Sequence, residues 1–291
     1  NRRYDAGRAE ISRAAVPVVS VGNLTLGGTG KTPVIEWLAR WYRARGVRVA
    51  IVSRGYGANR MQQNDEALEL EQKLPDVPHL QDPDRVAAAR IAVDELDAEL
   101  ILLDDGFQHR RLARDIDLVL LDALEPFGYG HVFPRGSLRE SPRGLARAHA
   151  VILSRADAVD ASRREAIRAR AAELAPQAIW LEATQRPQRL FAWHRGESPL
   201  DDAGTRVAAF CGIGNPAGFR HTLEAAGYDV AAFREFPDHF AYDRATITEL
   251  ERWAAAADAS RVLCTHKDLV KLQIDRLAEL PLDALLIGIE F

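Results

Sequence analysis

The chain has 291 residues, 47% of them hydrophobic, and a formal net charge of −4 at pH 7, so it can bury one large core or two moderate ones. Two cysteines at no metal-ligand spacing exclude a disulfide-stabilised secreted scaffold and fit a reducing cytosolic compartment. No stretch has the length of a transmembrane helix or the form of a secretory signal, and we expect a globular protein of two domains.

The first predicted element is an apolar strand at residues 16–22, which leads into the glycine-rich turn GNLTLGGTGKTP and then a helix. Glycines let the backbone N–H groups of such a turn point inward, and the helix adds the positive end of its dipole, so the turn is typical of a phosphate-binding loop. The candidate nucleotide-binding residues are Gly27, Gly28, Thr29, Gly30, Lys31 and Thr32. Thr25 stands at the first glycine position of the usual pattern, so the prediction depends on the flanking strand and helix.

The last two residues of this loop have specific chemical roles in a nucleotide site. Lys31 would bridge the β- and γ-phosphates, and the Thr32 hydroxyl would bind Mg²⁺. The alternative is a glycine turn that binds nothing, which the combination of strand, turn, Lys-Thr and helix makes the weaker explanation.

Apolar strands alternate with helices through the first part of the chain. The predicted strands are 16–22, 48–53, 99–104, 116–122 and 150–154, and the predicted helices are 31–45, 84–97 and 160–174. The strands are continuous apolar runs, which is typical of a parallel sheet buried on both faces. We therefore predict an α/β fold of the P-loop NTPase type, with a mostly parallel sheet, helices on both faces and the ligand at the carboxyl ends of the strands.

Residues 185–205 are rich in Pro, Gly and charge, which predicts a linker resembling a β-ribbon. A second alternation follows, with strands predicted at 206–214, 228–233, 261–266 and 284–291 and helices at 216–226 and 243–256. The expected organisation is a P-loop domain (1–184), a linker (185–205) and a smaller α/β domain (206–291) that completes the site.

Asp104 and Asp105 directly follow the predicted strand 99–104. P-loop NTPases place an aspartate near Mg²⁺ from a neighbouring strand in this way, so one carboxylate could hold the metal while the other orients its water or contacts substrate. Two acids after a strand more often form a turn or a cap, but the phosphate-binding loop makes the metal role the better explanation.

Positive charge is concentrated in residues 1–60, where ten Arg and one Lys stand against three acidic residues, an excess of eight. The excess indicates an anionic partner, such as a nucleotide, a nucleic acid or an acidic membrane surface. By charge alone, a solvated arginine-rich face is the better explanation.

Two further segments are rich in arginine. FQHRRLARD, from Phe107, either balances charge around a triphosphate or forms a salt-bridged loop, and the sequence favours neither. Arg139, Arg143 and Arg147 would share one face of a helix and suit an anionic sugar phosphate or lipid headgroup, but Pro142 predicts a turn before any helix.

Asp65 in NDEALELE and His239 in FPDHFAY are the remaining candidate residues. Each one alone is more often a capping or turn residue, so its chemical role depends on the rest of the sequence.

Taken in chain order, eight segments resemble the tetraacyldisaccharide 4′-kinase family over nearly the whole chain. They are VGNLTLGGTGKTP, SRGYG, NDEALELE, DDGFQHRRLARDIDLVLLDA, PRGSLRE, FCGIGNP, FPDHFAY and THKDLVKL. The phosphate-binding loop together with DDGFQHRRL is the most specific part. Asn64, Ser141 and His266 stand where the family usually has Gly, Pro and Glu.

The resemblance implies an enzyme that transfers the ATP γ-phosphoryl group to the 4′-hydroxyl of a tetraacylated glucosamine disaccharide 1-phosphate, which forms lipid IVA in lipid A biosynthesis. It implies ATP and Mg²⁺ as cofactors. By position, it assigns Asp65 as the catalytic aspartate, His239 as its partner, and Arg139 to phosphate or substrate. It also assigns Lys31 as the loop lysine, Thr32 as an Mg²⁺ ligand and the acidic pair as the metal-binding carboxylates.

The resemblance also implies a glycolipid substrate and a location at the cytoplasmic face of the bacterial inner membrane. Members usually begin with an apolar membrane-binding helix, and this chain begins after it, at Asn1. We therefore expect peripheral contact with the anionic membrane surface, or anchoring by an N-terminal segment absent from this chain. No nucleic-acid partner is expected, since the basic excess has no interleaved aromatic platform. The sequence indicates no obligate protein partner.

Two other functions remain open. A P-loop switch ATPase acting on a protein partner would share the loop and the acidic pair, but it would not need Asp65 with His239. A non-catalytic nucleotide-binding module would show negligible ATP turnover with every acceptor. Acceptor-dependent release of ADP separates these functions from a kinase.

Overall fold

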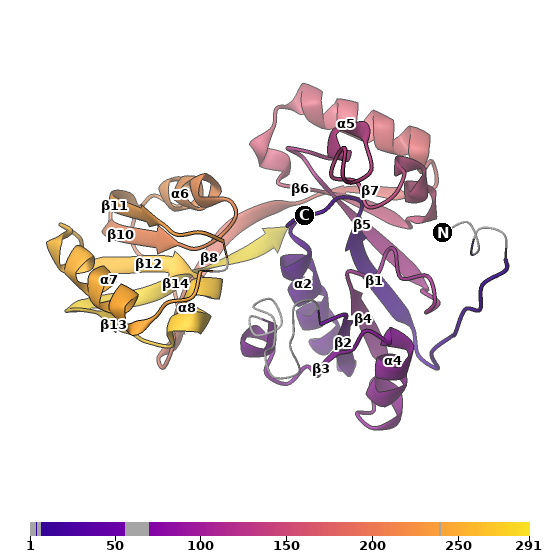
Figure 1. The fold of residues 1–291 in the computed structure, drawn as a ribbon, viewed down its shortest axis with the longest axis horizontal. Coiled ribbons are helices and arrows are strands. Elements are labelled where there is room, and N and C mark those ends of the chain that lie inside the picture. The colour runs from indigo at the N-terminus through magenta and orange to yellow at the C-terminus, as the bar shows by residue number, and fades with distance from the viewer. Residues whose placement is uncertain (1–3, 5–6, 56–69, 239) are drawn as a thin grey trace. The chain divides into compact units, whose positions relative to one another are not determined.

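The computed structural model describes residue 4 and residues 7–55, 70–238 and 240–291. The chain divides into two compact units, Asn1–Gln185 with Ile289–Phe291, and Arg186–Gly288 (Figure 1). Asp65 and His239, two of the predicted site residues, lie outside the described residues. Within the part of the chain that is described, no helix is both long and apolar enough to cross a membrane.

A seven-stranded sheet forms the centre of the first unit, with strand order β3-β2-β4-β1-β5-β6-β7. Its strands are β1 (Val18–Asn23), β2 (Val49–Ser53), β3 (His79–Gln81), β4 (Leu100–Asp104), β5 (Ile116–Asp122), β6 (Ala150–Ser154) and β7 (Ile179–Glu182). All neighbouring strands pair in parallel. Strands β1, β2 and β6 are buried along their whole length, which confirms the parallel, doubly covered sheet predicted from their apolar runs.

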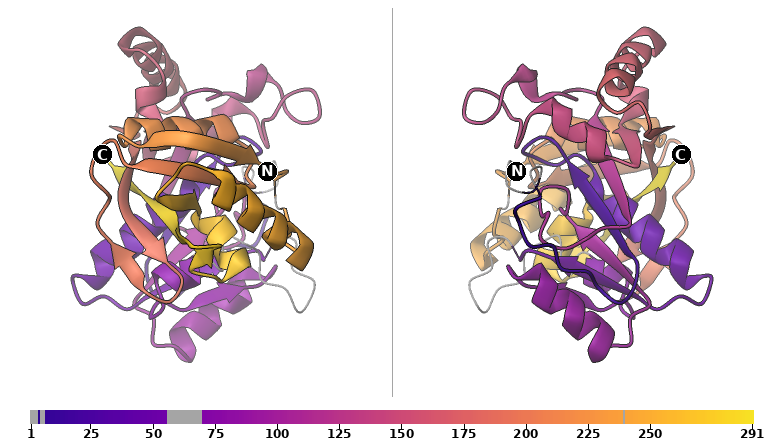
Figure 2. Two further views of the ribbon diagram at one scale, coloured as in Figure 1. Left: turned by 90° about the vertical axis from the view of Figure 1, so that its left-hand side faces the viewer. Right: turned by 90° about the vertical axis from the view of Figure 1, so that its right-hand side faces the viewer.

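Helices cover both faces of this sheet (Figures 1 and 2). They are α2 (Lys31–Arg43), α4 (Arg85–Asp94) and α5 (Ala161–Leu174). Because strand side chains alternate between faces, Val19 packs in one core cluster with Val34 and Ile35 of α2, while Val18 packs in another with Val86 of α4. The α5 residues belong to a third cluster on the same face as α4. The two helices on that face begin at aspartate N-caps, Asp84 and Asp160.

Strands β3 and β7 were not predicted from the sequence. They are the two edge strands of the sheet, with three and four residues respectively. Neither strand has a fully buried residue, because an edge strand does not need the continuous apolar run that identifies a central strand.

The second unit has its own sheet, of order β11-β10-β12-β14-β8-β9, with β13 paired to β14. Its strands are β8 (Thr184–Ala192), β9 (Gly196–Ser198), β10 (Arg206–Cys211), β11 (Asp229–Glu235), β12 (Arg261–Thr265), β13 (Arg276–Leu277) and β14 (Leu280–Glu290). Strands β10, β11, β12 and β14 pair in parallel, whereas β8 and β9 form an antiparallel hairpin within the segment predicted as a β-ribbon. Helix α6 (Pro216–Ala225) packs in one core cluster, and α7 (Arg244–Ala256) and α8 (His266–Leu272) pack in the other.

Helix α8 corrects the sequence prediction, which extended a strand through His266. Strand β12 ends at Thr265, and the hydroxyl oxygen of Thr265 accepts a hydrogen bond from the backbone N–H of Asp268 at 3.3 Å. This N-cap starts the helix at the next residue, so the strand and the helix meet without a loop.

His79, on edge strand β3, links the pH to the stability of the first unit. Its Nε2 lies 2.8 Å from Ser53 Oγ, and burial lowers the pKa of His79 to about 4 from the ordinary 6.5. Between these values the unfolded chain binds a proton that the folded chain does not, so stability falls as the pH drops from 6.5 towards 4. From pH 7 to pH 5 the unfolding free energy of the wild type should decrease, because His79 is protonated only in the unfolded chain. In the His79→Gln variant this decrease should be smaller by about 2 kcal/mol.

Urea titrations at the two pH values measure this difference. The exposed His221 of α6 provides the matched control, and the His221→Gln variant should keep the wild-type pH dependence. An equal pH dependence in the His79→Gln and wild-type proteins would contradict the prediction.

Candidate active site

The glycine-rich loop lies between β1, a central strand, and the start of α2 (Figure 1). Gly27 has φ 107° and Gly30 has φ 83°, both in the left-handed region that favours glycine. Gly30 is also the N-cap of α2 and offers no side-chain acceptor, so no cap side chain competes for the first N–H groups of the helix. Such a helix start binds anions through its amides and its dipole.

Gly30 has little tolerance for a side chain. A Cβ at this position would combine a positive φ with a contact of 3.0 Å to Nε2 of Gln185. We expect Gly30→Ala to lower the free energy of unfolding by about 1–2 kcal/mol, because an L-residue is strained in this conformation. Gly28 has open space where a Cβ would lie and no left-handed φ, so Gly28→Ala should unfold at the wild-type urea midpoint. Equal midpoints for the two variants would contradict this expectation.

Residues 137–139 form hydrogen bonds with the residues just before the glycines of the loop. The backbone N–H of Leu26 donates to Ser137 O, and that of Arg139 donates to Leu24 O, each at 2.7 Å. The Arg139 side chain also donates from Nε to Thr25 O at 3.0 Å. Thr25, which replaces the usual first glycine, is therefore buried in a backbone pairing that fixes the loop.

Asp105 lies beside the loop, immediately after β4, with φ 50°. Its Oδ2 accepts a hydrogen bond from Arg139 Nη1 at 2.5 Å, and its Oδ1 lies 3.5 Å from Lys31 Nζ. Burial alone would raise the pKa of Asp105, but the charges of Lys31 and Arg139 outweigh burial and hold the pKa below its usual value. A non-glycine residue in this backbone region is uncommon and often marks a functional site.

Arg85 adds a third positive charge, which no sequence motif indicated. It is the first residue of α4, is only 4% exposed, and donates from Nη1 to the backbone oxygen of Asp105 at 3.0 Å. Burial lowers the pKa of Arg85, while the charges of Asp105 and Asp104 oppose that shift. Lys31, Arg85 and Arg139 therefore gather around Asp105 and create a positive environment that suits a polyanion.

Arg155, another residue that no motif predicted, also contacts the loop. It follows β6 with φ 54°, donates from Nη2 to Gly28 O at 3.3 Å, and pairs with Asp122 at the end of β5. The residues that follow β4 and β6 thus contact the loop or its lysine, while Asp122 at the end of β5 holds Arg155, as expected for a ligand site at the carboxyl ends of a parallel sheet.

Arg139, Arg143 and Arg147 do not share one helical face, in agreement with the turn that Pro142 predicted before any helix. Residues Pro142–Arg147 make a short 3₁₀ helix that begins at the Ser141 N-cap, and Arg139 lies outside it. Arg147 donates to Glu140 Oε1 at 2.7 Å and lies over the Phe107 ring, with its guanidinium carbon 4.4 Å from the ring centre. Pro142 breaks the expected i, i+4 spacing, so Arg139 turns to Asp105 and Arg147 to Glu140.

For the FQHRRLARD segment, the structure favours the ion-paired alternative at two arginines. Arg111 pairs with Asp84 at 3.2 Å, and Arg114 pairs with Asp117 at 3.1 Å in an almost fully buried contact. Neighbouring His109 is partly buried, and burial together with Arg85 and the other arginines lowers its pKa to about 4. His109 is therefore neutral at physiological pH and adds no charge to the site.

The structure brings together Lys31, Asp105 and Arg139, while Asp104 ends the neighbouring strand and Thr32 is the second residue of α2. Among the described residues, no group of three or more His, Cys, Asp or Glu side chains is arranged to hold a metal ion. A smaller oxygen set is present in the two carboxylates and the Thr32 hydroxyl, but their arrangement around an ion stays a prediction.

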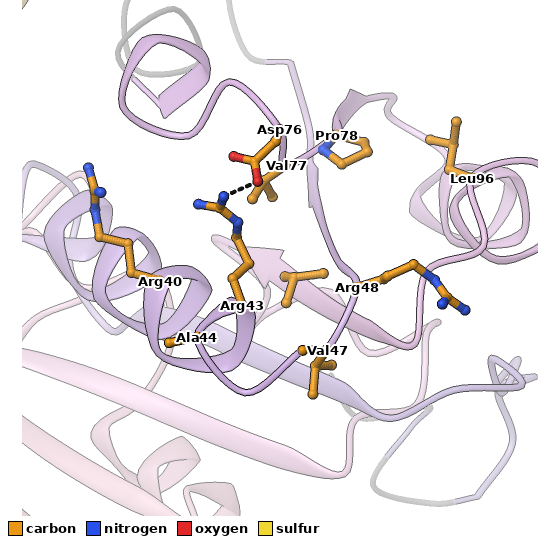
Figure 3. A pocket seen from close by; sticks show the side chains of 11 residues that line it. Arg40, Arg43, Ala44, Val47, Arg48, Asp76, Val77, Pro78 and Leu96 are labelled. Carbon is orange, nitrogen blue, oxygen red and sulfur yellow. Dashed lines mark hydrogen bonds and ion pairs between the residues drawn. The ribbon is translucent and has the colours of Figure 1, made fainter. Parts of the chain in front are cut away.

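A pocket of about 640 Å³ lies away from these residues, at the opposite end of α2 (Figure 3). Arg43 points across it to an ion pair with Asp76, and Arg40 and Arg48, which also line it, pair with acidic residues. Because none of the loop residues lines this pocket and its arginines are already paired, we place the candidate site at the loop instead.

A glycine-rich loop between a central parallel strand and a helix, with Lys-Thr at the helix start and a carboxylate from the adjacent strand facing the lysine, defines the class of P-loop NTPases. The family follows from comparison with known proteins. A model of the tetraacyldisaccharide-1-P 4′-kinase family matches residues 1–290. The chain therefore belongs to this family, which confirms the resemblance predicted from its motifs and identifies it as a phosphotransferase of lipid A biosynthesis.

Individual members of the family are similar to this chain over most of its length. A tetraacyldisaccharide 4′-kinase from Anaeromyxobacter dehalogenans (strain 2CP-C) is 43% identical over 287 residues, which cover 92% of this chain and 76% of the relative. One from Syntrophus aciditrophicus is 36% identical and covers 94% of this chain and 79% of its own length. The crystal structure of the "apo" form of LpxK from Aquifex aeolicus in complex with ATP matches with a TM-score of 0.76 and 29% identity, over 100% of this chain and 89% of the other.

Proposed function

We propose that this chain transfers the γ-phosphoryl group of ATP to the 4′-hydroxyl of a tetraacylated glucosamine disaccharide 1-phosphate and so forms lipid IVA. The observation that carries the proposal is the convergence of Lys31, Arg85 and Arg139 around Asp105, next to the uncapped start of α2. In a member of this kinase family, such a cluster suits the triphosphate of ATP, which the Aquifex aeolicus relative binds.

At the nucleotide end, the amides from Gly27 to Thr32 would hold the phosphates, and Lys31 would bridge the β- and γ-phosphates. Negative charge spreads over the transferring phosphoryl oxygens in the transition state, so fixed positive charges at this point lower the barrier. Arg139 is well placed to contribute, because its contacts with Thr25 O and Asp105 already orient its guanidinium beside the loop.

The chemistry of the donor set fits Mg²⁺. Asp104, Asp105 and Thr32 offer only oxygen ligands, which this ion prefers, and the buried Oδ1 of Asp105 accepts no hydrogen bond within the described part of the chain. When bound, Mg²⁺ would neutralise phosphate charge during the transfer. We propose that Thr32 and at least one of the two aspartates hold it.

At the acceptor end, we propose that Asp65 accepts the proton of the 4′-hydroxyl and that His239, from the smaller domain, orients and tunes Asp65. For the domain organisation, we propose a P-loop domain at 1–184, a linker at 185–205 and a smaller domain at 206–291 that completes the active site.

The acceptor is a glycolipid, so we further propose peripheral contact with the anionic cytoplasmic face of the inner membrane, where the positive excess of residues 1–60 is favourable.

Transfer of label from γ-³²P-labelled ATP to the disaccharide 1-phosphate, with Mg²⁺ and detergent, tests the proposed function. We expect labelled lipid with the free 4′-hydroxyl and none with an acceptor whose 4′-hydroxyl is blocked. ADP release that ignores the glycolipid and responds to a protein would instead support the switch ATPase. The absence of labelled lipid under every detergent condition would overturn the substrate assignment.

A further inference from the structure

Residues 124–138, which follow β5 in the first unit, form a loop that projects from the body of that unit (Figure 2). Residues 129–135 at its tip are all exposed. Three of them are large hydrophobic residues, with exposed fractions of 74% for Tyr129, 46% for Val132 and 65% for Phe133. Single exposed apolar side chains are common on protein surfaces, but three within five consecutive residues form a patch that indicates a binding partner.

The backbone of this loop is held by its own hydrogen bonds. The N–H of Phe133 donates to Leu138 O at 2.9 Å, and that of Leu138 donates back to His131 O at 3.1 Å. The N–H of Tyr129 donates to Glu125 Oε1 at 2.8 Å. Backbone groups that are already paired within the protein lose no hydrogen bond when they approach an apolar phase.

The base of the loop is fixed in the core of the first unit. Leu138 is fully buried, and Phe127 packs against the same core cluster. A Cβ at Gly136 would collide with Gly128 O, so this turn of the loop requires glycine. Tyr129 has φ 56°, a conformation that is uncommon for a bulky residue and persists only where the surrounding structure imposes it. The exposed side chains of the tip are therefore a defined feature of the surface.

The charges of the loop suit an anionic surface. The tip contains the basic residues His131 and Arg135 and no acidic residue. Arg143, in the 3₁₀ helix that follows the loop, is also exposed. Glu125, which precedes the tip, is partly buried and accepts the backbone N–H of Tyr129. Exposed aromatic rings beside basic side chains are typical of protein surfaces that meet lipid headgroups.

The size of the patch favours a membrane over a protein partner. A stable protein interface buries about 800 Å² on each side, from about 20–30 residues. The tip offers three large apolar side chains and one arginine. Insertion into a lipid surface has no such size requirement, because each apolar side chain that leaves water contributes on its own.

The tip is also connected to the phosphate site. Ser137, two residues beyond the tip, accepts the backbone N–H of Leu26 at 2.7 Å. Arg139 pairs with Asp105, and four residues of extended chain span at most about 14 Å, so Arg135 lies within that distance of Arg139 along the chain. A tip held at a lipid surface therefore keeps the phosphate-binding loop close to that surface.

We propose that residues 129–135 form a membrane-docking tip. In this proposal Tyr129, Val132 and Phe133 enter the interface of an anionic phospholipid bilayer, and Arg135 pairs with lipid phosphate. The inference rests on the peripheral membrane contact proposed above and assigns residues to it. The tip brings the phosphate site to the bilayer, where the glycolipid acceptor resides, and it does not touch the reacting atoms.

Sedimentation with vesicles of phosphatidylcholine and phosphatidylglycerol tests the proposal without the kinase reaction. We expect Phe133→Ser to bind these vesicles about tenfold more weakly than the wild type, and the double variant Val132→Ser with Phe133→Ser to bind more weakly still. Both should melt close to the wild type, because the replaced side chains are exposed. Wild-type vesicle binding by the double variant would overturn the proposal.

Ile179→Ser is the matched control. Ile179 is as exposed as Phe133, at 65%, and belongs to the same unit. It is the first residue of β7, which runs parallel to β5 and β6, so it lies at the opposite end of the sheet from the loop that follows β5. Its loss should leave vesicle binding unchanged. An equal loss in Ile179→Ser and Phe133→Ser would show general surface hydrophobicity and overturn the assignment to the tip.

Arg135→Gln tests the charge of the tip. It should weaken binding about fivefold on vesicles with phosphatidylglycerol and have little effect on vesicles of phosphatidylcholine alone, because one basic side chain near an anionic surface contributes on this scale. An equal effect on both kinds of vesicle would overturn the pairing of Arg135 with anionic lipid.

A fluorescent probe at position 132 reports insertion directly. Cys211 and Cys264 are buried, and burial raises the pKa of both thiols, so a thiol introduced by Val132→Cys is labelled selectively. A nitrobenzoxadiazole label on this cysteine should become brighter with vesicles and be quenched by spin-labelled lipid, whereas the same label on Ile179→Cys should not respond. Emission at position 132 that ignores vesicles would overturn insertion and leave a protein partner as the explanation of the patch.

Label transfer from ATP separates the failure of this inference from the failure of the proposed function. With acceptor in detergent micelles, the double variant should phosphorylate lipid at the wild-type rate, whereas with acceptor in vesicles its rate should fall about tenfold or more. An equal loss in micelles and vesicles would overturn the docking role and place the tip at the acceptor itself. Wild-type protein that binds vesicles through the tip but phosphorylates no lipid would overturn the proposed function alone.

Discussion

The Asp65→Ala variant is expected to transfer phosphoryl groups to the glycolipid about a thousandfold more slowly than the wild type, while it binds ATP with nearly unchanged affinity. A sugar hydroxyl is a poor nucleophile until it begins to lose its proton, and a positioned general base contributes about 10²–10⁴-fold to such a step. The nucleotide end of the site, with its loop amides and Lys31, does not depend on Asp65 in the proposed mechanism. The loss should therefore appear in kcat and not in the dissociation constant of ATP.

Two measurements on purified protein check this expectation. Label transfer to lipid gives kcat, and calorimetric titration gives the affinity for ATP. Asp65→Asn keeps the shape of the side chain and removes its basicity, so it should be nearly as slow as Asp65→Ala. Turnover close to that of the wild type in either variant would remove Asp65 from the mechanism. A loss of ATP affinity as large as the loss of kcat would show that Asp65 contributes to ATP binding and not to activation of the acceptor hydroxyl.

The central sheet of the first unit was predictable because its strands are buried on both faces. The run Val18–Asn23 is buried at every position, which is typical of a parallel sheet covered by helices on both sides. The edge strands β3 and β7 have no such signal, since their pairing depends on the neighbouring strand. Helix α8 was missed for another reason. Its start depends on the Thr265 cap, which directly ends an apolar strand.

The candidate site was predicted where the chemistry is local in sequence. The phosphate-binding loop and its lysine form one continuous segment, and Asp105 follows the adjacent strand. Arg85 and Arg155 could not be predicted in the same way, because each donates to a backbone carbonyl that only the fold brings near, Asp105 O and Gly28 O respectively. Neither arginine belongs to a motif with a fixed spacing from its partner.

Exchange of Lys31 for methionine tests the site at its positive centre. Lys31 Nζ lies 3.5 Å from Asp105 Oδ1, and its side chain is only 13% exposed, so the ammonium group is already held at the loop. Removing one fixed donor to developing charge typically costs about 10²–10³-fold in rate, and this lysine also bridges two phosphates in the proposed mechanism. We expect Lys31→Met to lose about a thousandfold in kcat/KM for ATP.

Lys73→Met is the matched control for this exchange. Lys73 belongs to the same unit and pairs with Glu36 at 3.0 Å, with a side chain only 6% exposed, so its loss should lower stability but leave kcat of the folded protein near the wild-type value. Lys31→Arg restores the charge but not the compact ammonium group, and it should recover only part of the activity. Comparable rates for Lys31→Met and Lys73→Met would show that the loop lysine serves folding rather than phosphoryl transfer. If kcat/KM for ATP falls about a thousandfold in Lys31→Met and stays near the wild-type value in Lys73→Met, the positive charge at the loop contributes directly to phosphoryl transfer.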